Sequence, residues 1–87
     1  MTIRGLNEHD IEEWLENEKI LSEQVQILRG HIVINVSYEY NIPLENCSTY
    51  KNILHWAWHL TEKPWMSQEL TRKFIEVACE AHGLEYQ

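Results

Sequence analysis

Two histidines, His55 and His59, stand four residues apart in the segment HWAWHLTEKPW. On a helix, side chains at this spacing lie one turn apart on the same face, within reach of one metal ion, and Glu62 adds a carboxylate three residues further on. A zinc protease of the helical two-histidine type would carry glutamate where Trp56 stands, and no CxxC pair supplies further ligands. We therefore expect no metal and no cofactor. A small metal- or ligand-binding domain built on His55, His59 and Glu62 is the alternative hypothesis.

The sequence carries no catalytic motif. Its three glycines, Gly5, Gly30 and Gly83, are too scattered to form a phosphate-binding loop, and no nucleophile elbow is present. Cys47 and Cys79 stand apart from each other, and we expect both thiols to be reduced and buried. We therefore predict that the protein is not an enzyme.

Three of the four tryptophans fall in the same segment and offer rigid aromatic area for a core or for binding. Trp56 and Trp58 lie about 160° apart on a helical wheel, so they cannot both face one neighbouring helix. Trp58 stands at the edge of the apolar arc of this helix, and Trp65 follows Pro64 in the closing turn. We expect most of the aromatic area in the core, and Trp58, His59 and Trp65 as candidate interaction residues. The apolar arc comprises Ile53, Leu54, Trp56, Ala57, Trp58 and Leu60.

Acidic residues gather near the N-terminus of the chain. The whole sequence has 14 acidic and 7 basic residues, a net charge of −7, which disfavours direct binding to nucleic acids. Glu12, Glu13 and Glu16 form an acidic face on the first predicted helix and are further candidate interaction residues. This face could dock a basic partner. An acidic inhibitor that imitates nucleic acid is another alternative.

Helix signals predict a mainly α fold, a single domain over residues 1–87 with about four short helices. The first helix should end near residue 20 and bear Ile11, Trp14 and Leu15 on an apolar face opposite its acids. The last helix should end at Gly83, with Leu84 folding back onto it. The predicted N-terminal caps are Asn7, Ser22, Ser48 or Thr49, and Ser67.

Residues 22–40 admit two interpretations. Read at period two, Ile32, Ile34 and Val36 alternate with more polar neighbours, which favours a strand. Read at period 3.6, Val25, Leu28 and Ile32 belong to one helical stripe. The run 41–43, Asn-Ile-Pro, is typical of a helix C-terminus and favours the helix. The alternative is an α+β fold with paired strands at 31–39 and 54–60.

The expected function follows from these exclusions. No apolar run approaches the ~20 residues that span a membrane, and the first residues lack the apolar region of a signal peptide. We expect a cytoplasmic, non-catalytic protein-interaction module that binds another protein, above all a second copy of itself in a homodimer. Compact, acidic and without motifs, the chain is similar in type to small accessory proteins of phages and other mobile elements.

Overall fold

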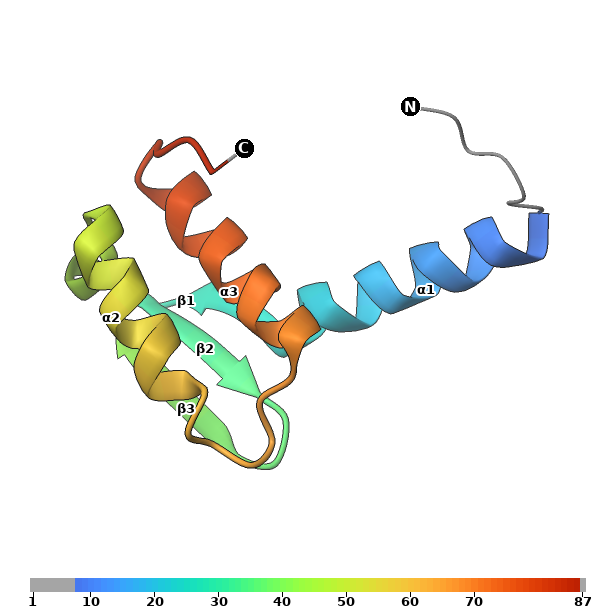
Figure 1. The fold of residues 1–87 in the computed structure, drawn as a ribbon, viewed down its shortest axis with the longest axis horizontal. Helices are drawn as coiled ribbons and strands as arrows, with labels where there is room; N and C mark the ends of the chain where they lie inside the picture. Colours follow the sequence, from blue (N-terminus) through green and yellow to red (C-terminus); the bar gives the residue numbers. More distant parts are fainter. Residues whose placement is uncertain (1–7, 87) are drawn as a thin grey trace.

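The structure, a computed structural model, describes residues 8–86. In this range the elements are α1 (Glu8–Gln24), β1 (Val25–Leu28), β2 (His31–Asn35), β3 (Glu39–Pro43), the 3₁₀ helix η1 (Leu44–Cys47), α2 (Tyr50–Leu60) and α3 (Gln68–Ala81). The strands form an antiparallel meander in the order β1-β2-β3, so β2 is central. Helices α2 and α3 lie side by side on one face of the sheet, whereas α1 projects away from the body (Figure 1).

The fold is α+β, and the prediction of a mainly α domain with four helices is wrong. Residues 22–40, predicted as one helix, contain the end of α1, the strands β1 and β2, and the start of β3. The physical reason is the turn at Arg29 and Gly30, where φ is 52° and 76°. Two successive positive φ angles are what a two-residue type I′ hairpin turn requires, and a right-handed helix cannot pass through them. Leu28 and His31 pair across this turn.

The alternative prediction also fails for residues 54–60, which lie inside α2. Of residues 31–39, those from 31 to 35 form β2, and their partners are β1 and β3. Pro43, which supported the prediction of a helix C-terminus, is instead the last residue of β3. This strand pairs with β2 alone, and a proline is tolerated at the end of such an edge strand because its missing N–H is not needed by a further neighbour.

Helix α1 is longer than predicted. It continues past residue 20 and leads directly into β1, so Ser22 lies inside a helix and caps none. The predicted cap at Asn7 lies outside the described residues. The contacts of α1 with the body come from its C-terminal half, where Leu21 packs against the core and Glu18 lies 3.9 Å from the Lys73 ammonium of α3.

The predicted N-terminal caps of α2 and α3 and the predicted C-terminal end of α3 are confirmed. Thr49 and Ser67 have extended backbones, and the side-chain oxygen of each accepts a hydrogen bond from the N–H three residues on, at 3.2 Å and 3.1 Å. Gly83 has a φ of 66°, and the N–H of Leu84 donates to the carbonyl of Cys79 at 2.8 Å. These are the features of a Schellman motif, which ends a helix with a glycine.

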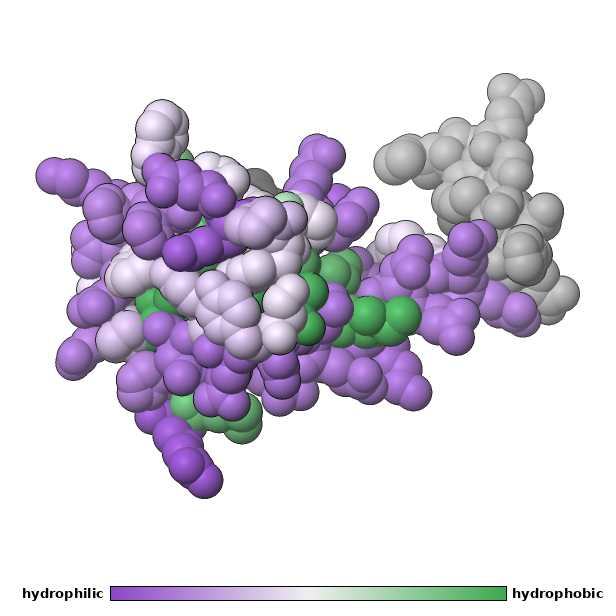
Figure 2. Space-filling model, turned by 90° about the horizontal axis from the view of Figure 1, so that it is seen from below, coloured by the Kyte–Doolittle hydropathy of each residue, from purple (hydrophilic) through white to green (hydrophobic). Residues whose placement is uncertain are grey.

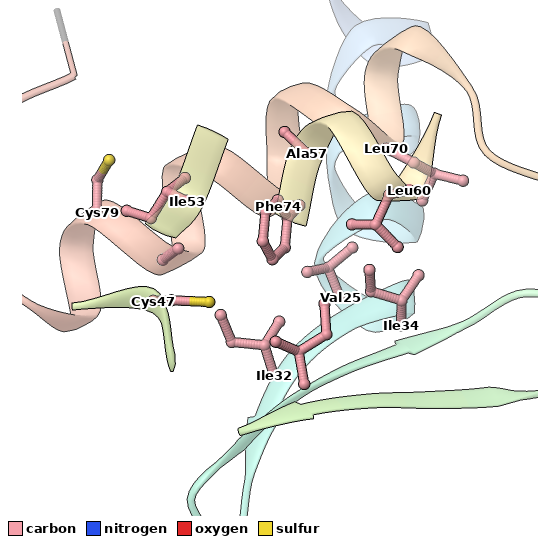
Figure 3. Packing of buried hydrophobic residues seen from close by; sticks show 12 residues of the cluster. Val25, Ile32, Ile34, Cys47, Ile53, Ala57, Leu60, Leu70, Phe74 and Cys79 are labelled. Carbon is pink, nitrogen blue, oxygen red and sulfur yellow. The ribbon is translucent and has the colours of Figure 1, made fainter. Parts of the chain in front are cut away.

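A hydrophobic core fills the space between the sheet and the two helices that cover it (Figure 3). Phe74 of α3 is fully buried and lies between Ala57 of α2 and the strand residues Val25 and Ile32. Both cysteines are buried and unpaired. The other buried members of the cluster are Ile34, Ile42, Cys47, Ile53, Leu60, Leu70, Ala78 and Cys79.

Replacing Gly30 by alanine should lower the free energy of unfolding by about 1–2 kcal/mol, the cost of a left-handed backbone for an L residue. An added Cβ would meet no atom within 4 Å, so the effect isolates backbone strain. Urea unfolding followed by circular dichroism measures it. Arg29→Asn is the matched variant, expected to be neutral or stabilising because asparagine accepts positive φ more readily. An unchanged urea midpoint in Gly30→Ala would contradict this turn geometry.

Candidate interaction surfaces

Helix α2 turns one apolar face to the core and a second one to solvent. Tyr50, Leu54 and Trp58 follow one another at four-residue intervals and therefore form a continuous row along the helix. Their exposed fractions are 56%, 70% and 74%. We call these three residues the α2 ridge. The buried positions of the same helix are Ile53, Ala57 and Leu60.

The apolar arc predicted for this helix is thus divided. Its buried part packs on the core and Trp56 is half-buried, but Leu54 and Trp58 face solvent. The arc is wider than the surface that the sheet and α3 can cover. Trp58 is one of the predicted interaction residues, whereas Tyr50 and Leu54 were missed. The i, i+4, i+8 spacing of the three side chains is the sequence signal that would have found them.

Hydrogen bonds fix the side chain of Tyr50 at one end of the α2 ridge and the backbone of Trp58 at the other. The Tyr50 hydroxyl donates to the backbone carbonyl of Glu85 at 2.6 Å, which fixes the ring against the segment after α3. At the other end, the Thr61 hydroxyl donates to the carbonyl of Trp58 at 2.6 Å. The Tyr50 ring, which is already oriented, loses less conformational freedom on binding, so this end of the ridge is organised for a partner.

Trp65 belongs to a different part of the molecule. Its ring is half-buried and packs edge-on to Tyr38 (5.7 Å between centroids) and tilted against Tyr40 (5.8 Å). The Lys63 ammonium lies 5.3 Å from the centre of the Tyr40 ring. Trp65 therefore attaches the loop between α2 and α3 to the sheet. The aromatic rings that the Trp65 ring meets are those of Tyr38 and Tyr40, on the sheet side of the loop.

The histidines of α2 lie around Trp56. The rings of His55 and His59 both meet the Trp56 ring edge-on, at 6.0 Å and 5.7 Å between centroids. His55, His59 and Glu62 are all exposed. Between residues 8 and 86, no three His, Cys, Asp or Glu side chains gather in a way that could hold a metal ion. The geometry therefore adds nothing in favour of the metal-binding alternative.

The predicted acidic residues lie on the projecting helix α1. Glu12, Glu13 and Glu16 are exposed, away from the α2 ridge. Four apolar side chains of α1, those of Ile11, Trp14, Leu15 and Ile20, are also exposed, and Figure 2 shows hydrophobic surface where α1 leaves the body. Of the candidate interaction residues, Glu12, Glu13 and Glu16 thus lie on α1 and Trp58 lies in the α2 ridge, whereas His59 and Trp65 belong to neither surface.

The two thiols are unsuited to nucleophilic chemistry at neutral pH. Burial raises the pKa of Cys47 from its ordinary 9.0 to about 11, and burial raises the pKa of Cys79 as well. A thiolate is the reactive form of cysteine, and it is scarce at pH 7 for both residues. Their role is packing within the core.

Comparisons with protein-family models, with characterised proteins and with solved structures found no match to this chain. None of the helices formed by residues 8–86 has the length and apolar character to cross a membrane.

Proposed function

We propose that the protein is a small non-catalytic interaction module that binds another protein through the α2 ridge. The observation that carries this proposal is the continuous exposed row of Tyr50, Leu54 and Trp58 on a helix whose opposite face is anchored in the core. Together the three side chains expose roughly 400 Å², as large as the largest apolar patch of many monomeric proteins, and such patches are often functional.

The composition of the ridge supports the same proposal. Tyrosine and tryptophan are enriched among the residues that dominate binding energy, because each offers a large rigid area with a polar end. Trp58 is the most exposed of the three residues, and it stands next to polar side chains such as His59. An apolar centre beside a polar rim is the usual anatomy of a protein interface.

The sequence predicted a second copy of the chain as partner, with Trp58 or Trp65 at the interface. For the α2 ridge we propose a different protein instead, because Trp65 is used inside the fold and three side chains of one helix make a small interface for a homodimer. We further propose that the module acts in the cytoplasm, which the two buried, unpaired thiols support.

Replacing Leu54 by a photo-crosslinking amino acid tests this proposal. In cells that naturally make the protein, we expect one discrete cross-linked species from this position and none from Glu69, an exposed position on another helix. With the partner identified and purified, Trp58→Ala should weaken binding by about 30-fold or more, the effect of losing a central interface tryptophan.

The matched control is His55→Ala, which removes an exposed ring from the same helix without touching the α2 ridge. We expect its affinity to stay within about threefold of the wild type, as for most residues at an interface rim. The absence of any adduct from position 54, or equal affinities for Trp58→Ala and the wild type, would refute a docking role for the ridge.

A further inference from the structure

Residues 11–17 of α1 are exposed to solvent. Each side chain from 11 to 17 is exposed, including Ile11 (45%), Trp14 (60%) and Leu15 (55%). Ile11 and Trp14 lie on the same face of α1 as Glu18 and Leu21, because the four positions follow the 3-4-3 spacing of a helical stripe. Glu18 contacts α3, and Leu21 contacts the core. One stripe is therefore covered by the body at its C-terminal end and uncovered at the other.

A helix in this situation lacks its usual source of stability. Short helices are marginal in water, and most of their stability in proteins comes from packing of an apolar face. The radius of gyration of 14.2 Å exceeds the roughly 12 Å of a compact domain of this length, in agreement with a projecting helix. A partner that covers the apolar stripe on α1 would therefore stabilise this helix.

Helices α1 and α3 diverge from their junction and form a V (Figure 1). The groove between them is lined by apolar and charged side chains of both helices and of the segment after α3. Trp14 contributes from one side, and Ile75 and Tyr86 from the other. The remaining lining residues are Glu18, Arg72 and Glu76. The groove thus has the mixed character of a helix-binding surface.

We propose that two copies of the chain form a dimer in which the α1 helix of each copy lies antiparallel to the other, inside the groove between α1 and α3 of its partner. This inference concerns α1 and does not depend on the proposed role of the α2 ridge. Helix α1 is about 25 Å long and 10 Å wide. In a two-fold arrangement each copy supplies one helix and one groove, so the dimer contains two such contacts, and a standard stable interface needs roughly 800 Å² per copy.

Charge favours the antiparallel arrangement. Lys19 is the one lysine or arginine within α1, whose other charged residues are acids. Parallel helices would place the acids of the two copies opposite one another. An antiparallel pair centred near Leu15 instead brings Lys19 of one copy close to Glu12 of the other on the flank of the stripe, while Glu13 stays in water.

Sedimentation velocity of the purified full-length chain tests the dimer. We expect the wild type to be dimeric at tens of micromolar, and Trp14→Glu and Leu15→Glu each to raise the dissociation constant by more than about 30-fold, as for a charge placed in an interface centre. Glu13→Ala and Trp58→Ala should leave the dimer intact. Both glutamate variants alter exposed positions, and circular dichroism confirms that they fold.

Single-cysteine additions test the orientation, because both native thiols are buried. Glu12→Cys mixed with Lys19→Cys should form disulfide-linked heterodimers faster than either variant alone forms homodimers. A wild type that stays monomeric at 200 µM (about 2 mg/ml by mass of the chain), or a dimer lost in Trp58→Ala but kept in Trp14→Glu, would overturn the proposal. Faster homodimer disulfides from Glu12→Cys alone would overturn the antiparallel arrangement.

Discussion

Phe74→Ala should lower the free energy of unfolding by about 3–5 kcal/mol, the cost of removing a buried phenylalanine and leaving a cavity. The ring is fully buried at the centre of the core, where α2, α3 and the sheet meet. Small domains have a thin margin of stability, so a loss of this size should leave a substantial unfolded population at 37 °C. Urea unfolding monitored by circular dichroism measures the change.

Leu54→Ala is the matched control, because it removes a large apolar side chain that is 70% exposed. We expect a change within about 0.5 kcal/mol, as for surface substitutions that leave no cavity. Equal losses from the two variants would mean that Phe74 is not enclosed and would contradict the packing of α3 on the sheet.

Raising the pH from 9 to 11 should progressively destabilise the fold through Cys47. Burial raises the pKa of this thiol from 9.0 to about 11, so the unfolded chain loses the proton at lower pH than the folded one. The folded state then binds more protons in this window, and stability falls as pH rises. The stabilisation of the fold that comes from the protonated Cys47 thiol is fully present below pH 9, and about 2–3 kcal/mol of it is lost by pH 11. Urea unfolding at a series of pH values gives the slope.

Cys47→Ala provides the comparison, since it keeps a small apolar side chain in the core but cannot titrate. Its free energy of unfolding should fall less steeply between pH 9 and 11 than that of the wild type. Every other titratable group is the same in both proteins, so the difference between the two slopes isolates the Cys47 thiol. Parallel slopes would show that this thiol is not desolvated in the folded state.

The two proposed surfaces are separable by experiment. Trp58 belongs to the α2 ridge, and Trp14 belongs to the stripe on α1. Substitution of Trp58 should weaken binding of the foreign protein and leave the dimer intact. Substitution of Trp14 should weaken the dimer, so each tryptophan is the control for the other. If both surfaces act as proposed, the dimer presents two α2 ridges, and a partner with two sites would gain affinity through simultaneous binding.

The ends of α2 and α3 were predictable from sequence alone. Thr49, Ser67 and Gly83 act on groups within five residues of themselves, by accepting from an N–H or by allowing a left-handed turn. The buried stripe of α3, with Phe74 at its centre, likewise follows from helical periodicity along one segment. These features depend on local hydrogen bonds and spacing, which a linear sequence contains.

Only the tertiary structure decided the state of residues 25–43 and the exposure of the α2 ridge. Alternation and helical periodicity both fit this stretch, and the strands are stabilised by pairing with each other, through the turn at Gly30, rather than by any signal within one strand. In the same way, the apolar arc of α2 is one continuous pattern in the sequence. Which part of it meets the core depends on how far the sheet and α3 extend, and that left Leu54 and Trp58 in solvent.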